Sequence, residues 1–423
     1  MQNKIVVGID VAKDFSYFAM IGPDNKQIGK QFRVNHTLEE LEDVIKRMKE
    51  VETRLKSQCV LIMESTGHYS SILFNFFHRS NFEVYLVNPL QTNSIKNLQV
   101  RKVKNDKIDA YRIAMLFKLG ELRPYLPPRE DLAKIKVLCR HYYKLVDDSV
   151  MYKNDLIALV DQIFPGYQKI FSDITSLSSL YVLENYSSSK KLLNADRNEL
   201  TSNLSAISKR GLDWANKKAD ALISMAKSAI KLKSAPITAE IALKSCIAIL
   251  KAFYEQIKHI ENEIIALSND VEEIKLVDSI TGIGPISAAT IVSEIRNFEN
   301  FSSAKKLVAF CGIDPAVMES GKFKGSKVKI SKRGSRYLRR VLYIAALANI
   351  KQYHGKYINP VLAEYYQAKI QSKPRKVALV AVMHKLVNYI FAVLRDKKPF
   401  RVITPEEHME VYAQKTTSAK QVA

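Results

Sequence analysis

Two long runs of apolar residues, each with steps that alternate between three and four positions, constrain the fold of this chain most strongly. The first run extends from Leu132 to Ile163, and the second extends from Leu243 to Ile274. Alternating steps of three and four residues are typical of the apolar seam of a coiled coil. A serine-rich, less periodic stretch at about 172–234 separates the two predicted helices. They form either an antiparallel coiled-coil stalk or two amphipathic helices of one bundle, and in neither case do they carry catalytic chemistry.

The residues before this helical region, 1–125, predict an α/β domain. Short apolar runs bounded by Asp, Gly and Asn are typical of strands, and spaced apolar residues with charges between them are typical of helices. Three strands come first, then a helix, and strands and helices alternate after it. This order of elements is that of an RNase H-like fold. The predicted strands are 4–10, 15–21, 28–34, 59–63 and 83–87, and the predicted helices are 38–55, one after Gly67, and about 106–119.

The remainder of the chain predicts a linker region at 126–275, a mainly α-helical domain at 276–400 and a polar tail at 401–423. The last predicted helix, 375–394, contains the longest apolar stretch of the sequence. His384, Lys385 and Asn388 interrupt that stretch, so it predicts a packed helix and no membrane span.

The charge of the chain favours a polyanionic partner. It carries 65 Lys and Arg against 43 Asp and Glu, a net charge of +22. Nucleic acid is the commonest polyanion that such a protein meets. A hydrophobic content of 47% excludes wholesale disorder. The four cysteines lie far apart, which excludes a zinc knuckle or a disulfide scaffold, and the N-terminus does not resemble a signal peptide. We therefore expect a reducing, cytoplasmic setting.

Four acidic residues stand where a metal site would need them. Asp10 and Glu64 each end a predicted strand, and Asp106 and Asp109 are three positions apart, so they share one face of a helix. Carboxylates in such an arrangement form a hard oxygen cage suited to Mg²⁺, which can hold two ions about 3.5–4 Å apart across a phosphate. The alternative is that these acids are ordinary turn residues and that Asp106 is a helix N-cap.

A glycine pair in the C-terminal domain predicts a second phosphate contact. Gly282 and Gly284 precede a predicted helix at 287–295, as in the turn of a helix-hairpin-helix. Backbone N–H groups at such a turn face a phosphate. The same pattern also fits a helix start without a ligand.

Residues 320–341, which we call the basic strip, contain nine cations and no acid. Nine like charges repel one another unless an anion lies among them, so the strip predicts phosphate binding. The alternating lysines predict an extended hairpin, and 335–340 predicts a helix start. The cations are Lys322, Lys324, Lys327, Lys329, Lys332, Arg333, Arg336, Arg339 and Arg340.

Several hydroxyl groups of the basic strip are candidate nucleophiles. Ser320 precedes Gly321 and is therefore accessible, although its pattern alone is common. Sequence alone does not rank it against the other hydroxyls of the strip. These are Ser326, Ser331, Ser335 and Tyr337.

Taken together, these segments resemble the DEDD-type serine transposases of bacterial insertion sequences, the IS-110 and IS-1111 family, which includes Piv-type DNA invertases. The resemblance rests on the strand-end acids with KNDKIDA, on SITGIGPISAATIVSEI, and on FCGIDPAVMESGKFKGSKVKISKRGSRYLRRVLYIAA. It covers residues 1–119 and 276–346, and the helical region between them matches in character only. The serine-rich stretch makes this chain longer than compact members of the family.

The resemblance implies an RuvC-like N-terminal domain that binds Mg²⁺ and a C-terminal transposase domain whose serine attacks DNA. The matching positions are Asp10, Glu64, Asp106 and Asp109 for the metal and Ser320 for the nucleophile. It also implies cutting and rejoining of double-stranded donor and target DNA, a noncoding guide RNA from the element, and a homodimer or homotetramer. The expected location is the bacterial cytoplasm, at the nucleoid, without a membrane.

Two alternatives remain open at this point. The first is an RuvC-like metal nuclease that uses water, in which Ser320 contacts phosphate only. The second is a basic nucleic-acid-binding scaffold without activity, in which the acids only cap helices and interact with solvent.

Overall fold

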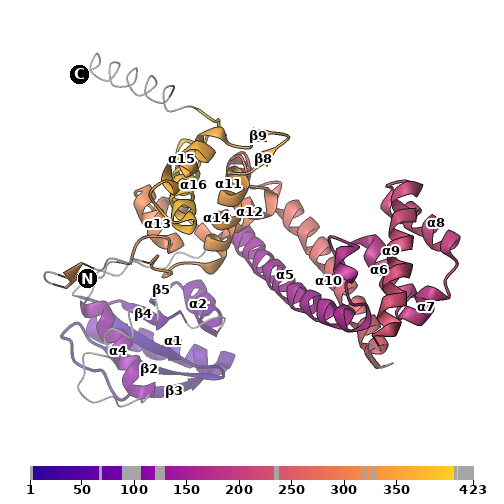
Figure 1. The fold of residues 1–423 in the computed structure, drawn as a ribbon. Helices are drawn as coiled ribbons and strands as arrows, with labels where there is room; N and C mark the ends of the chain where they lie inside the picture. Colours follow the sequence, from indigo (N-terminus) through magenta and orange to yellow (C-terminus); the bar gives the residue numbers. More distant parts are fainter. Residues whose placement is uncertain are drawn as a thin grey trace. The chain divides into compact units, whose positions relative to one another are not determined.

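The computed structural model describes residues 3–65, 69–87, 106–119, 129–232, 238–316, 319–320, 323–324, 329–403 and 407. It divides into two compact units, Met1–Pro127 and Pro128–Ala423, which are described separately below (Figure 1). The first unit ends two positions after the predicted limit of the α/β domain, and the second contains the rest of the chain.

The first unit is built on a mixed five-stranded sheet with the order β3-β2-β1-β4-β5. β1 pairs antiparallel with β2 and β2 with β3, whereas β4 lies parallel to β1 and β5 parallel to β4. The order of elements along the chain is the one predicted. The elements are β1 (Ile5–Val11), β2 (Phe15–Ile21), β3 (Phe32–Asn35), α1 (Leu38–Leu55), β4 (Cys59–Glu64), α2 (Tyr69–Arg79), β5 (Glu83–Val87) and α4 (Asp106–Leu119).

The third strand is shorter than predicted, because it begins at Phe32 and not at residue 28. Gln27 forms an isolated β-bridge with Ile21 of β2, and the Ile28 N–H donates to the Met20 carbonyl of the same strand. Gly29 then takes a positive φ of 69°, which interrupts the extended backbone.

Helices cover both faces of this sheet. Odd-numbered residues of β1, such as Ile5 and Ile9, belong to a core with α1 and α2, and Val6 belongs to a core with α4. This division follows the alternation of side chains along a strand. The first unit is therefore a three-layer α/β/α arrangement, with α4 alone among the described helices on its side.

Gly8 allows α4 to lie directly on β1. A Cβ atom at this position would lie 2.1 Å from the Ala110 carbonyl oxygen and 2.6 Å from the Ala114 nitrogen, both in the backbone of α4. Real Cβ atoms do not approach backbone so closely, so only glycine fits between β1 and α4.

We expect Gly8→Ala to lower the free energy of unfolding by about 1–3 kcal/mol, because α4 has to move away from the sheet. Urea denaturation of the full chain measures the change. Gly22→Ala is the matched control, since the one close neighbour of its new Cβ would be an Asp24 side-chain oxygen at 2.7 Å, which can rotate away, and the nearest backbone atom would lie at 3.6 Å. Equal losses in the two variants would contradict this account of Gly8.

The second unit contains the two long helices predicted from the apolar runs. They are α5 (Glu130–Ile163) and α10 (Thr238–Ser268), which pack side by side (Figure 1). Cys139 near the start of α5 shares a core with Ile264 near the end of α10, whereas Leu156 shares a core with Leu243. The helices are therefore antiparallel, which fits both predicted arrangements, and the coiled coil stays a prediction.

The second apolar run does not continue as one helix to Ile274. α10 ends at Ser268, and a new helix, α11 (Glu272–Asp278), begins after Val271 takes an extended conformation. Asn269 and Asp270 lie at the break. Their short polar side chains compete for backbone hydrogen bonds, which favours helix ends.

The serine-rich stretch between the long helices is a folded helical bundle that shares one apolar core with the adjoining ends of α5 and α10. Its serines take structural positions, for example at the cap of α7, where the Ser188 hydroxyl accepts from the Lys191 N–H. Ser179 is buried and its hydroxyl lies 3.1 Å from the Tyr167 hydroxyl. The elements are η1 (Tyr167–Lys169), α6 (Leu177–Asn185), α7 (Ser189–Leu193), α8 (Arg197–Ser208) and α9 (Leu212–Lys231).

The rest of the second unit is mainly helical, as predicted, and shares one apolar core with the nearby ends of α5 and α10. Residues 404–406 and 408–423 of the predicted polar tail lie outside the described residues. The elements are α12 (Pro285–Ile295), η2 (Phe298–Asn300), α13 (Ala304–Cys311), β6 (Glu319–Ser320), β7 (Phe323–Lys324), α14 (Arg336–Asn349), β8 (Gln352–Tyr353), β9 (Lys356–Tyr357), α15 (Pro360–Ile370) and α16 (Arg375–Asp396).

α16 is the helix that contains the long apolar stretch. Within the described residues it alone is long and apolar enough to cross a membrane by length and composition. Its buried side chains, which lie between Ala378 and Leu394, belong to the core of the second unit, and the helix packs against α14 and α15. It is therefore a packed core helix, as the interrupting polar residues predicted.

Candidate active site and nucleic-acid interface

Asp10 and Glu64 lie at the carboxyl ends of adjacent parallel strands. In the pairing of β1 with β4, Ile9 lies opposite Met63, and the next residue on each strand is the acid. Both side chains are half-buried. The register of the sheet therefore brings two of the four predicted metal ligands to neighbouring positions on one sheet edge.

Asp109 lies in the first turns of α4, the helix that packs on β1. Its side chain is 6% exposed. The Arg112 guanidinium donates to Asp109 Oδ1 at 2.8 Å, so a cation one turn away accompanies this buried carboxylate. Sequence analysis did not identify Arg112, although the spacing of three between Asp109 and Arg112 predicts contact on a helix.

Asp106 begins α4, and its side chain lies outside the described part of the structure. Among the described side chains, no group of three or more His, Cys, Asp or Glu is placed to hold one metal ion. The donor set nevertheless fits a hard divalent cation, because Asp10 and Glu64 are neighbours on the sheet and Asp109 lies on the helix against it. The four-acid metal centre stays a prediction.

In the second unit, Ser320 lies on a short β-hairpin. Ser320 pairs with Phe323 and Glu319 with Lys324. The base of the hairpin is formed by a bridge between Pro315 and Ile330. A hairpin is present as predicted, but β6 with Ser320 forms its first strand, whereas the lysine alternation placed both strands after Gly321.

Gly334, in the second half of the basic strip, packs against the end of α13. A Cβ on Gly334 would lie 1.8 Å from the Phe310 carbonyl oxygen, so this position requires glycine. Arg339 Nη1 donates to the Gly334 carbonyl at 2.7 Å and to the Cys311 carbonyl at 3.4 Å. Arg339 therefore closes the loop between α13 and α14 through backbone contacts that the sequence did not predict.

Arg340 also has a partner within the fold. Its guanidinium pairs with Asp147 of α5 at 2.7 Å and lies 4.6 Å from the centre of the Tyr143 ring. The strip contains no acid, but a residue far away in the sequence supplies this counter-charge.

The other cations of the basic strip fall into two groups. Four are exposed and available to a phosphate backbone: Lys329, Lys332, Arg333 and Arg336. The side chains of the other three are outside the described residues: Lys322, Lys324 and Lys327.

Most alternative hydroxyls of the strip already have hydrogen-bond partners. Ser331 donates to Asp314, and Ser335 caps α14 by accepting from the Leu338 N–H. Tyr337 accepts from Arg336 Nη2 at 3.0 Å and packs against the Tyr143 ring. Ser326 and the side chain of Ser320 lie outside the described residues.

The glycine turn lies between α11 and α12. Gly282 has a φ of 80°, and a Cβ there would lie 2.3 Å from Asn349 Nδ2. Gly284 is the N-cap of α12, with Pro285 in the first turn and open space where a Cβ would stand. The space beside Gly284 is therefore open, whereas Asn349 fills the space beside Gly282, and phosphate binding by a helix-hairpin-helix stays a prediction.

Comparison with known proteins agrees with these features. Residues 7–165 match a family of DEDD transposases of the IS110 type, and residues 274–367 match the IS116/IS110/IS902 transposase family. The chain belongs to the IS110 family of transposases. The two matches together span more than half of the chain and contain all four acids, the glycine turn and the basic strip.

The relatives of this transposase include proteins of insertion elements and an invertase. It is 22% identical to an uncharacterized 44.8 kDa protein of insertion element IS116 from Streptomyces clavuligerus, over 95% of this chain and 98% of that protein. It is 27% identical to the pilin gene-inverting protein of Moraxella bovis, over 36% of this chain and 47% of that protein. The resemblance inferred from the motifs is therefore confirmed.

A solved structure of RuvC from T. thermophilus in complex with a Holliday junction substrate is also similar. It has 12% identity and a TM-score of 0.22, and the match covers 29% of this chain and 99% of that one.

Proposed function

We propose that this transposase cuts and rejoins DNA through a covalent serine–phosphate link, with Ser320 as the nucleophile and Mg²⁺ held by Asp10, Glu64, Asp106 and Asp109. The observation that carries the proposal is the pairing of β1 with β4, which makes Asp10 and Glu64 neighbours at one sheet edge in an RNase H-like arrangement. Oxygen donors at such an edge suit a divalent cation that binds a phosphodiester.

The carboxylates and the serine have complementary roles in this proposal. A divalent cation, when held by the acids, supplies Lewis-acid polarisation of the phosphoryl oxygens. Ser320 Oγ forms a bond to phosphorus and gives up its proton to solvent. The bond from phosphorus to the leaving sugar oxygen breaks, and that oxygen takes up a proton. A hydroxyl of the second DNA strand later reverses these steps, so rejoining needs no ATP.

Ser320 is supported over three of the other hydroxyls of the strip by the contacts that those three make. Ser331, Ser335 and Tyr337 already take part in hydrogen bonds that hold the loop and the start of α14. Lys332, Arg333 and Arg336 are exposed cations of the same strip, and they would neutralise the DNA phosphates beside the cut.

Further partners follow from family membership. We propose that the chain acts on double-stranded donor and target DNA as a homodimer or homotetramer in the bacterial cytoplasm, at the nucleoid, with a noncoding guide RNA from its own element. A net charge of +22 suits a protein that holds several nucleic-acid strands at once. RNA that copurifies with the full chain and matches the DNA beside its gene would test the guide.

We expect Ser320→Ala to abolish covalent protein–DNA adducts on a suicide substrate, since no Oγ remains to attack phosphorus. Denaturing gels of the full chain with labelled DNA measure the adduct. Ser302→Ala is the control, because Ser302 is an exposed serine outside the strip, and its adducts should persist.

Two results would contradict the serine mechanism. Adducts that survive in Ser320→Ala would eliminate Ser320 as the nucleophile. Free 5′-phosphate ends without any adduct in the wild type would favour the nuclease that uses water, which the acids alone would also support.

A further inference from the structure

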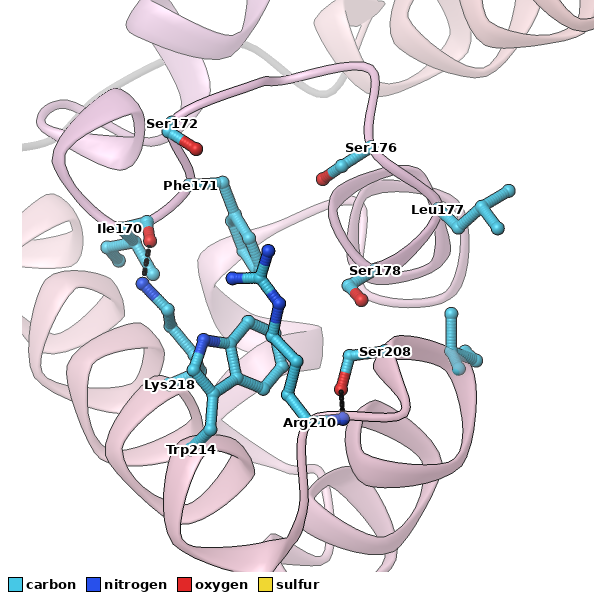
Figure 2. Close-up of a pocket in the computed structure, with 11 residues that line it drawn as sticks. Ile170, Phe171, Ser172, Ser176, Leu177, Ser178, Ser208, Arg210, Trp214 and Lys218 are labelled. Atoms are coloured by element: carbon cyan, nitrogen blue, oxygen red, sulfur yellow. Dashed lines mark hydrogen bonds between the residues drawn. The ribbon is translucent and has the colours of Figure 1, made fainter. Parts of the chain in front are cut away.

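A pocket in the helical bundle combines cations, aromatic rings and hydroxyls. Its volume is about 240 Å³, and it lies between the segment that precedes α6 and the junction of α8 with α9 (Figure 2). We call it the bundle pocket. It is lined by, among others, Phe171, Ser176, Ser178, Arg210, Trp214 and Lys218.

One wall of the bundle pocket is cationic and aromatic. The Arg210 guanidinium lies 5.6 Å from the centre of the Trp214 ring, and the Lys218 ammonium lies 5.7 Å from the same ring and 5.6 Å from the Phe171 ring. Lys218 also donates to the Ile170 carbonyl, which holds its ammonium at the pocket (Figure 2). Arg210 is exposed and makes no ion pair within the described residues.

The opposite wall is the N-terminus of α6. Ser176 is the N-cap, but its side chain makes no capping bond, and its hydroxyl points into the pocket in Figure 2. The first N–H groups of a helix lack partners within the helix and carry partial positive charge. The pocket thus has positive character on both sides.

Ser178 adds a hydroxyl group to the lining of the pocket. The residue as a whole is 6% exposed, and no hydrogen bond to its hydroxyl is found in the part of the chain that is described. The nearby acid Asp173 is held by Lys153 at 2.7 Å, which reduces its repulsion of an anion.

We infer that the bundle pocket binds one unpaired nucleotide of a nucleic acid. The base would pack against Trp214 beside the Arg210 guanidinium, and the phosphate would bind at the start of α6 with Ser178 and the two cations. Stacking on aromatic and guanidinium planes is how proteins hold unpaired bases. Inorganic phosphate alone would make no specific contact with the aromatic rings, so these rings favour a ligand that also carries a base. A base pair is too large for a pocket of about 240 Å³. The inference is independent of Ser320 and of the four acids.

Trp214 makes the test specific, because it is the only tryptophan in the chain. Short single-stranded oligo-dT, oligo-U, AMP and inorganic phosphate are titrated into the full chain while the tryptophan fluorescence is followed. We expect quenching by the oligonucleotides and none by inorganic phosphate. Comparison of oligo-dT, oligo-U and AMP identifies whether DNA, RNA or a free nucleotide is the source of the nucleotide.

Two variants separate the pocket from general charge. Arg210→Ala should weaken oligonucleotide binding in the quenching assay about tenfold, since it removes a stacking plane and a cation. Lys217→Ala removes the same charge from an exposed neighbour on α9 that does not line the pocket, and it should have little effect.

Three results would overturn the inference. These are fluorescence that no oligonucleotide changes, equal quenching by inorganic phosphate, and equal losses of affinity in Arg210→Ala and Lys217→Ala. Each can occur whether or not Ser320 forms adducts, so this test and that of the proposed function fail independently.

Discussion

Asp10→Asn is expected to lower the rate of DNA strand cleavage about 10³-fold while the protein stays folded and binds DNA. The substitution keeps the shape of the side chain but removes one charged oxygen, beside Glu64, that the proposed metal site would use. Metal ions contribute several kcal/mol to phosphoryl-transfer transition states, and each 1.36 kcal/mol is tenfold in rate. Cleavage of labelled DNA, measured with Mg²⁺ present and after chelation, gives both rates.

Asp14→Asn is the matched control for this variant. Asp14 lies four positions further on, in the turn between β1 and β2, and its side chain is exposed. The same change of charge there should leave cleavage within about twofold, because electrostatic effects of exposed charges are small. Full cleavage by Asp10→Asn, together with indifference to chelation, would contradict the proposed metal site, whereas no cleavage by the wild type under any condition would favour the non-catalytic scaffold.

The sheet of the first unit could be predicted closely because its strands are short apolar runs bounded by turn residues. Ile5–Val11 and Phe15–Ile21 follow that pattern, and so does Cys59–Glu64. Asp10 and Glu64 could be placed at strand ends because the ends of these apolar runs are clear in the sequence. The sequence did not reveal the contact of Gly8 with α4, because a lone glycine inside a strand does not indicate what approaches it.

The helical bundle at the serine-rich stretch was not predicted. Two of its helices, Leu177–Asn185 and Ser189–Leu193, are short, and few turns give little periodicity. Serines such as Ser178 and Ser179 are buried within it, which blurs the contrast between apolar and polar faces. The bundle pocket was not predicted because the residues that line it lie on separate segments of the chain.

The contacts of the basic strip show a further limit of sequence analysis. Counting cations in 320–341 correctly identified a positively charged segment, but the partners of Arg339 and Arg340 lie elsewhere in the chain. Asp147 is on α5, and only the packed structure brings it to Arg340. Charge patterns therefore predict where cations gather and do not predict which of them remain available to DNA.

A buried ion cluster at α12 has the largest expected effect on stability. Glu294 is 3% exposed and lies on a helix whose residues from Ala288 to Ile295 are all buried. Arg140 binds its Oε1 at 2.6 Å, and Lys136 binds its Oε2 at 3.1 Å. One carboxylate thus holds two cations of α5 against the core of the second unit.

Glu294→Gln is expected to lower the free energy of unfolding by about 3–5 kcal/mol, because it leaves Lys136 and Arg140 close together without their counter-charge. Urea denaturation of the full chain, followed by circular dichroism, measures the change. Glu299→Gln, the same substitution at an exposed position, should change stability by about 0.5 kcal/mol or less.

The pH dependence of stability gives a second and independent readout of the same cluster. Burial lowers the pKa of Lys136 from 10.5 to about 8, although Glu294 opposes this shift. Between these values the unfolded chain binds more protons than the folded one, so the contribution of Lys136 to stability rises as the pH rises from 8 to 10.5. Without the Glu294 carboxylate the folded pKa falls further, and the rise should begin below pH 8 in Glu294→Gln. If the variant and the wild type showed parallel stability curves from neutral to alkaline pH, the carboxylate would not be what keeps Lys136 charged in the folded protein.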